Sequence, residues 1–152
     1  MAIARGAGTE IIRSAHFKDI ANTNADLIIG VQHHIYTVLS VIIHFRTIGG
    51  SATADAGATI LFVGYDTFGG TSAQNITVAN TQGRSALDTF VWNDKWCFNG
   101  TEPTDFTATL DATKQDAIAD QATTTAQKLQ VYTGHSSTTV DVTVSFIDQN
   151  NA

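Results

Sequence analysis

The sequence predicts an all-β fold, an antiparallel β-sandwich of jelly-roll type with at most one short helix. Apolar and polar residues alternate with a period of two along much of the chain, whereas helical periodicity is nearly absent. Threonine, whose branched Cβ favours strands, occupies 23 of the 152 positions. Turn residues separate the alternating segments at Asn22–Asn24, Gly49–Gly50, Gly69–Gly70, Gln82–Gly83, Asn99–Gly100 and Gly134–Ser136.

The segment from Val140 to Phe146 has the clearest alternation. Its three valines and Phe146 face one side, and Asp141, Thr143 and Ser145 face the other. This pattern is typical of a strand with one buried and one hydrated face.

The segment His33–Thr47 is apolar on both faces. A regular strand would place Ile35, Leu39, Val41, Ile43 and Phe45 on one face, and Tyr36, Val38, Ile42 and His44 on the other. We therefore expect this strand to lie in the centre of a sheet or against a partner subunit.

The remaining strands and the helix follow from the same rules. One helix of at most two turns is expected over Ala112–Asp120, with Asp111 as its cap. The further predicted strands are Ile11–Ile20, Asp26–Gly30, Thr59–Phe68, Asn75–Thr81, Ala86–Trp92, Lys95–Phe98, Phe106–Leu110 and Gln127–Thr133.

The aromatic segment Phe90–Phe98 is interpreted as a hairpin if Asn93 and Asp94 form a two-residue turn. Trp92 and Trp96 would then point to opposite faces of the hairpin. Neither face is polar, so we expect contacts on both sides.

The chain is expected to form one domain over residues 10–152, preceded by an arm over residues 1–9. No linker or internal repeat interrupts the strand pattern. The first residues lack the apolar core of a signal peptide, and the apolar stretch Ile35–Phe45 is about half as long as a membrane span. We therefore expect neither export nor membrane insertion.

Charge and cysteine content exclude further classes. The net charge is −6 with a pI near 5.0, which argues against a nucleic-acid partner. Cys97 is the only cysteine, so an intrachain disulfide cannot form.

No motif indicates catalysis, a metal site or a cofactor. The five histidines are His16, His33, His34, His44 and His135, and no single strand places two of them near one ion. A nucleophile elbow, a phosphate-binding loop and a calcium loop are all missing from the sequence. We expect a protein that is not an enzyme, with hydrogen-bonded histidines.

The aromatic residues leave two interpretations open. Tyr65 and Trp92 could stack against a sugar ring as part of a glycan-binding surface. Alternatively, the tryptophans pack in the core or in a subunit interface, where aromatic residues are enriched.

Three segments carry a resemblance to a known class of proteins. Ala4–Arg13, Gly30–Ser40 and Val140–Asn150 together resemble small virion proteins of tailed bacteriophages, particularly those that infect aquatic bacteria and cyanobacteria. This class includes capsid cement, or decoration, proteins. The resemblance implies a jelly-roll (TNF-like) sandwich that forms a homotrimer on the outer capsid surface and stabilises the head by bridging major capsid subunits.

The resemblance and the residue pattern together predict two contact regions. The arm is expected to bind the major capsid protein through Ile3, Arg5 and Thr9. The trimer interface is expected to contain Tyr36, Val38, Ile42, His44 and Trp92. The alternative functions are a receptor- or glycan-binding module on a tail fibre or capsid surface, with Tyr65 and Trp92 as its site, and a neck or tail adaptor.

Overall fold

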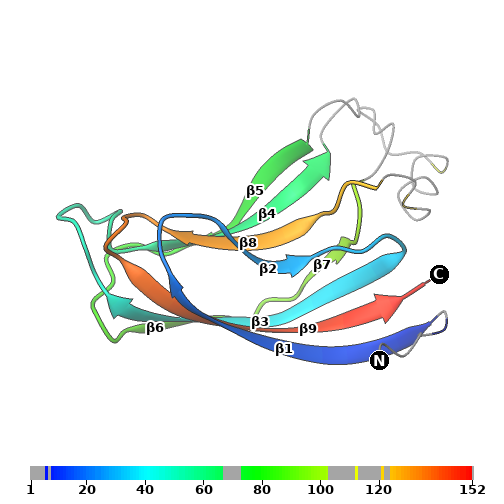
Figure 1. Cartoon of the computed structure of the whole chain (residues 1–152), viewed down its shortest axis with the longest axis horizontal. Coiled ribbons are helices and arrows are strands. Elements are labelled where there is room, and N and C mark those ends of the chain that lie inside the picture. The colour runs from blue at the N-terminus through cyan, green and yellow to red at the C-terminus, as the bar shows by residue number, and fades with distance from the viewer. Residues whose placement is uncertain are drawn as a thin grey trace.

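The described part of the computed structural model comprises residues 6, 8–66, 73–102, 112, 121 and 124–151. These residues form nine strands in two antiparallel sheets (Figure 1). The strands are β1 (Thr9–Ile20), β2 (Ala25–Ile29), β3 (His34–Thr47), β4 (Ala58–Asp66), β5 (Ala73–Asn80), β6 (Thr89–Trp92), β7 (Trp96–Asn99), β8 (Lys128–Thr133) and β9 (Thr139–Asn150). The predicted strand Phe106–Leu110 and, apart from Ala112, the predicted helix Ala112–Asp120 lie outside the described residues.

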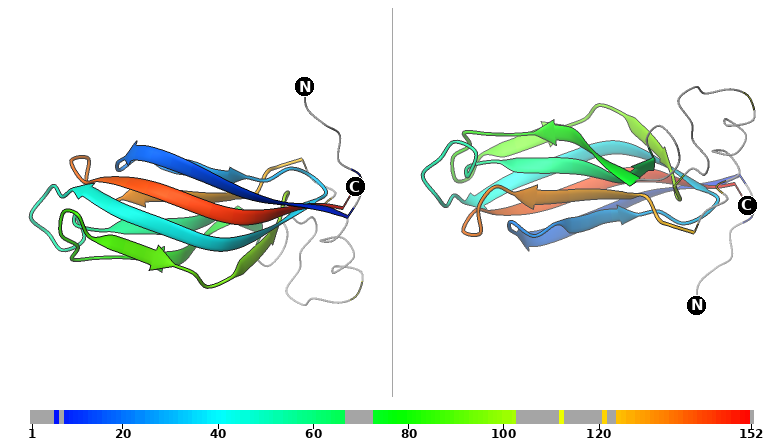
Figure 2. Two further views of the ribbon diagram at one scale, coloured as in Figure 1. Left: turned by 90° about the horizontal axis from the view of Figure 1, so that it is seen from below. Right: turned by 90° about the horizontal axis from the view of Figure 1, so that it is seen from above.

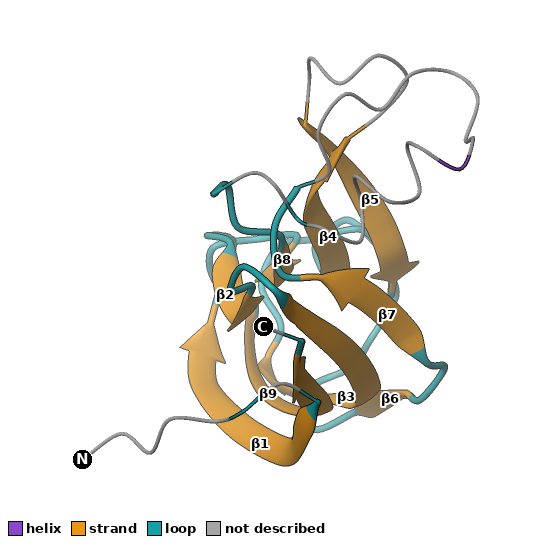
Figure 3. Cartoon of the chain, turned by 90° about the vertical axis from the view of Figure 1, so that its right-hand side faces the viewer, coloured by secondary structure: helices purple, strands orange, loops and turns teal. Residues whose placement is uncertain are grey.

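The larger sheet contains five of the nine described strands and the smaller sheet contains four. The larger sheet has the order β1-β9-β3-β6, and β7 pairs with β3 as well. The smaller sheet has the order β2-β8-β4-β5. Figure 2 shows the larger sheet from below and the smaller sheet from above, and Figure 3 shows the two layers from one end.

The strand pairing is that of a jelly roll, which confirms the predicted fold class. The chain follows a long hairpin whose tip is β4–β5: β1 pairs with β9, β2 with β8, and β3 with β6 and β7. Wrapping this hairpin around a core inserts β9 between β1 and β3, and β8 between β2 and β4. Among the described strands, β1 and the β6–β7 row are the edges of the larger sheet, and β2 and β5 are the edges of the smaller one.

The core lies between the two sheets. β9 buries every second residue along its whole length, as the alternation from Val140 to Phe146 predicted. Aromatic rings connect the layers: Phe62 of β4 lies 5.0 Å from Phe98 and 5.9 Å from Trp96, both on β7. Tilted pairs of this kind contribute roughly 0.5–1.5 kcal/mol each beyond the burial of their surface.

A β-bulge in β3 changes which residues face the core. The register with β9 shifts between Val38 and Ser40, so Leu39 is an extra residue in this strand. Before the bulge Tyr36 and Val38 point inward, and after it Val41 and the following odd-numbered apolar residues do. The prediction assumed a regular strand without this bulge. It therefore assigned to one face residues that lie on opposite faces of β3.

The aromatic segment does not form a hairpin. β6 and β7 both pair with β3, at Val41–His44 and at Ile35–Val38 respectively, so they follow one another along the same edge. Trp92 and Trp96 consequently both pack toward the core. Cys97 points outward and is exposed.

Two glycines allow the loop before β3 to approach the end of β7. A Cβ atom on Gly100 would lie 1.7 Å from the Val31 carbonyl oxygen, and one on Gly30 would lie 2.0 Å from the Gly100 carbonyl oxygen. The Gly100 N–H donates to the His34 carbonyl at 2.8 Å, and its carbonyl accepts from the Gln127 N–H at 3.0 Å. This backbone contact therefore connects the two sheets at one end.

A partly exposed ion pair joins β2 to β8. Asp26 accepts hydrogen bonds from Gln130 Nε2 at 2.5 Å and Lys128 Nζ at 3.0 Å. Burial acts to raise the pKa of Asp26, but the Gln130 and Lys128 hydrogen bonds and the Lys128 charge outweigh it. The pKa of Asp26 is therefore below its ordinary value.

Replacement of Gly100 by alanine should destabilise the protein strongly. The added methyl group would overlap with backbone atoms, which cannot rotate away, so Gly100→Ala should lower the free energy of unfolding by more than about 3 kcal/mol. Gly6→Ala is the matched control, because a Cβ there meets no atom within 4 Å. Urea denaturation measures both variants, and equal midpoints would contradict the close approach.

The Asp26 contacts predict a loss of stability in acid. Because the pKa is lowered in the folded state, the stabilisation is complete above the unfolded value of about 3.9 and is lost as the pH falls through the folded value. The Asp26→Asn variant should be less stable than wild type at pH 7, and the difference should shrink below about pH 4. Urea titrations at several pH values measure this difference, with Asp94→Asn at an exposed carboxylate as the control.

Candidate functional site

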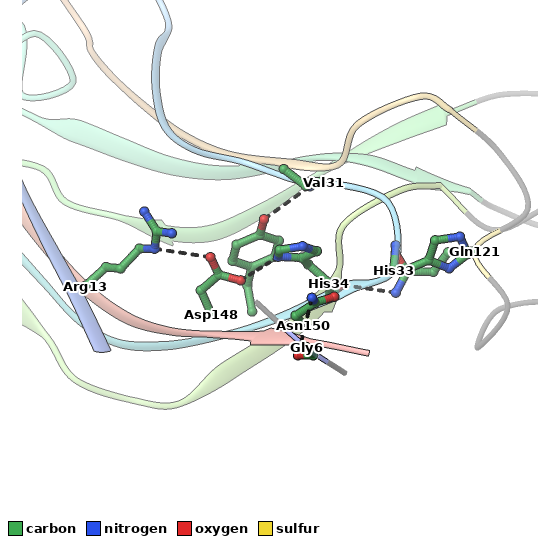
Figure 4. A network of polar contacts seen from close by, with 9 residues as sticks. Gly6, Arg13, Val31, His33, His34, Gln121, Asp148 and Asn150 are labelled. Atoms are coloured by element: carbon green, nitrogen blue, oxygen red, sulfur yellow. Dashed lines mark hydrogen bonds and ion pairs between the residues drawn. The ribbon is translucent and has the colours of Figure 1, made fainter. Parts of the chain in front are cut away.

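A network of polar side chains lies at the end of the sandwich where β1, β3 and β9 meet (Figure 4). Asp148 continues the inward-facing series of β9 and is 4% exposed. Its carboxylate accepts a hydrogen bond from His34 Nδ1 at 2.7 Å and forms an ion pair with Arg13 Nε at 3.1 Å. A buried carboxylate requires such partners, because an unpaired charge inside a protein is costly.

The sheet register explains why these three residues meet. Arg13 pairs with Phe146 and His34 pairs with Asn150, so both are diagonal neighbours of Asp148 on the strands that flank β9. Residues at such positions on one face lie within reach of long side chains. The network is therefore built into the pairing of the three strands.

Gln121 holds the loop between β2 and β3. Its side chain is 1% exposed, and Oε1 accepts from the His33 N–H at 2.8 Å while Nε2 donates to the His34 carbonyl at 3.0 Å. His33 has a positive φ of 64°, which is uncommon for a residue with a side chain. The amide thus satisfies backbone groups on both sides of a left-handed turn.

The first described residues are attached to the end of β9. The Gly8 N–H donates to the Asn150 carbonyl at 2.5 Å, and Thr9 is the first residue of β1, paired with Asn150. Thr9 therefore belongs to the sheet and not to a free arm. Ile3 and Arg5, the other two residues of the predicted arm contact, lie outside the described residues.

An open groove of about 260 Å³ lies beside the network. Arg13, His34 and Asp148 form its polar side. Ile29 and Val31 also line it and are 54% and 53% exposed. The other lining residues are the buried apolar or aromatic Leu27, Ile28, Tyr36 and Phe146. The groove can accommodate an apolar group beside a hydrogen-bonding group.

The groove contains a histidine–carboxylate pair. The pair His34–Asp148 has the arrangement that orients a histidine, and no serine, threonine or cysteine is among the nine described residues that line the groove. Within the described residues, no cluster of three or more His, Cys, Asp or Glu side chains could hold a metal ion. The described part of the chain also contains no helix of sufficient length and apolarity to cross a membrane.

A second surface is the outer face of the larger sheet. Three consecutive cross-strand rows on this face contain no Asp, Glu, Lys or Arg, and we call them the uncharged face. The rows are Ile12–Ile147–Thr37–Cys97, Ser14–Ser145–Ser40 and His16–Thr143–Ile42–Val91. Ile12, Ile42 and Val91 are 72%, 37% and 53% exposed, so these apolar side chains project from the uncharged face.

The structure corrects the predicted trimer interface. Tyr36 and Val38 are 3% and 0% exposed, because the bulge at Leu39 turns them into the core. Trp92 also packs inward. Ile42 and His44 do lie on the outer side of the sheet, where His44 Nδ1 and Thr89 Oγ1 are 3.1 Å apart.

The structure describes the side chain of only one member of the predicted glycan-binding pair, Trp92. The side chain of Tyr65 lies outside what is described, and the inward position of Trp92 does not favour a stacking surface. The residues that sequence reasoning missed are Asp148, Asn150, Gln121 and Arg13. For the first two a signal was present, because they continue the inward series of β9 as polar residues at buried positions.

Comparisons with known proteins add little to this description. No protein-family model and no curated protein matches the chain. Among solved structures, a chain from Bacillus endospore appendages, described as a novel family of disulfide-linked pili, aligns over 100% of this chain and 97% of its own length. The identity is 12% and the TM-score is 0.37, so this likeness carries no argument about function.

Removal of the Gln121 amide should destabilise the loop before β3. Gln121→Ala would leave the His33 N–H without this acceptor, which costs about 1–3 kcal/mol of unfolding free energy, and would remove one hydrogen bond from the His34 carbonyl, which still accepts from the Gly100 N–H. The matched control is Gln82→Ala, because Gln82 is exposed. Thermal unfolding followed by circular dichroism measures the difference, and coincident curves for both variants would show that the amide is not needed.

Proposed function

We propose that the protein is a virion structural protein of the capsid cement (decoration) type. In this proposal it forms a homotrimer on the outer surface of a bacteriophage head and bridges neighbouring major capsid subunits. It is made in the host cytoplasm, has no enzymatic activity, and acts by adding contacts that resist the internal pressure of the packaged genome.

The observation that carries this proposal is the uncharged face. Interface cores are depleted in charged residues, and this face presents three rows of small polar and aliphatic residues without a formal charge. Jelly rolls are also a common architecture of viral capsid proteins, which is consistent with the proposal but does not by itself assign a function.

The proposed interface differs from the one expected from the sequence. Ile42 is kept from the expected interface, and Ile12 and Val91 replace the buried residues Tyr36 and Val38 as apolar contacts. Three copies that cover this face would bury on the order of 2,000 Å² in total, which is within the range of permanent assemblies. The residues before Thr9, including Ile3 and Arg5, remain the proposed contact with the major capsid protein.

Particles assembled without the protein should release their DNA at a lower temperature than complete particles. Addition of purified wild-type protein should restore the release temperature. The double variant Ile42→Lys, Val91→Lys should be monomeric in sedimentation equilibrium and should not restore it, because it places two charges on the uncharged face. DNA release is measured by the fluorescence of an intercalating dye during heating.

The matched control is Thr77→Lys, which adds a charge at an exposed position of β5 in the smaller sheet. This variant should assemble and restore stability as wild type does. If particles that lack the protein are as stable as complete ones, the cement function is wrong. If the double variant still assembles and stabilises the particles, the uncharged face is not the interface.

A further inference from the structure

We propose that the groove beside Arg13 binds an extended peptide segment of a partner protein that carries an acidic residue two positions from an aliphatic one. This inference concerns a different surface from the uncharged face, and it does not depend on the proposed function. It rests on the free edge of a strand, on the size and lining of the groove, and on the hydrogen bonds of one arginine.

The groove lies where both sheets have an edge. β1 is the first strand of the larger sheet and β2 is the first strand of the smaller one. Among the described residues, no strand pairs with the outer edge of either. Arg13 lines the groove from β1, and Ile29 lines it from the end of β2. An exposed strand edge can accept an extended peptide as an additional strand.

The volume of the groove favours side chains over a whole small molecule. Small-molecule sites usually enclose about 300–1,000 Å³, whereas this open groove measures about 260 Å³. Its rim carries two exposed aliphatic residues, Ile29 and Val31, above the buried ring of Tyr36. It can therefore receive one aliphatic side chain from a peptide that lies along the rim.

Arg13 specifies an acidic residue in the peptide. Its Nε atom is held by the buried Asp148 carboxylate at 3.1 Å, which fixes the plane of the guanidinium group. Its two terminal amino groups donate to no other described residue. The side chain is 51% exposed, so these amino groups can meet a ligand. A guanidinium held in this way can donate two parallel hydrogen bonds to a carboxylate. Because the side chain is already fixed, it loses little further conformational entropy on binding.

Strand geometry sets the spacing between the two peptide residues. On a strand added to β1, the residue opposite Arg13 points to the same face as Arg13, and so do the residues two positions away. A carboxylate opposite Arg13 therefore places its neighbours at i−2 and i+2 over the groove. The peptide should read aliphatic-x-acidic or acidic-x-aliphatic.

A displayed library of random nine-residue peptides tests this proposal. Selection on the immobilised wild-type protein should enrich Asp or Glu two positions from Val, Ile or Leu. The most enriched peptide, synthesised with a fluorescent label, should bind in anisotropy titrations with a Kd at least tenfold lower for wild type than for Arg13→Gln or Ile29→Thr. Arg46→Gln is the matched control, because Arg46 pairs with Asp19 and Asp141 outside the groove and its loss should not change the Kd.

Three outcomes would overturn the proposal. The first is a selected peptide pool without the predicted spacing, and the second is a peptide that binds wild type and Arg13→Gln with equal Kd. A third is displacement of the peptide by an equal concentration of isovalerate, which would assign the groove to a free acid. Because Arg13→Gln weakens the support of Asp148, its thermal unfolding is measured first. If Arg13→Gln is unstable, Ile29→Thr provides the same test, because Ile29 is 54% exposed and this variant leaves Arg13 intact.

Discussion

The burial of every second residue of β9 is the constraint on which the rest of the structure depends. β9 pairs along its length with β1 on one edge and β3 on the other, so its inward series sets the register of both. A shift of one residue would exchange Val144 for Ser145 in the core. The same series carries Asp148 inside, where it pairs with Arg13 and is hydrogen-bonded to His34. The polar network is therefore a consequence of core packing.

Most of the fold followed from local pattern. Alternation and turn residues located the nine described strands to within a few residues, because each strand buries one face and ends at a turn. The same pattern could not locate the bulge at Leu39, since one extra residue leaves the composition of β3 unchanged and reverses its faces. Nor could it show that β6 and β7 both pair with β3, because that choice depends on contacts far apart in the sequence.

Less of the candidate site could be predicted. Asp148 was detectable as a polar residue in a buried series, whereas Gln121 contacts residues 87 and 88 positions away and carries no local signal. The uncharged face follows from the low charge of the sequence, which contains 14% charged residues, together with a register that only the fold supplies. Composition therefore indicated a surface poor in charge, and strand pairing decided which residues form it.

The pairing of Thr9 with Asn150 has a mechanical consequence. The hydrogen bonds between antiparallel strands run across the strand axes. A pull that separates the beginning of β1 from the end of β9 would load these bonds one after another, as in a zipper, and would open the sheet at low force. A pull along the strands would load many bonds at once. The larger sheet should therefore resist a force along its strands better than a force that separates its paired ends.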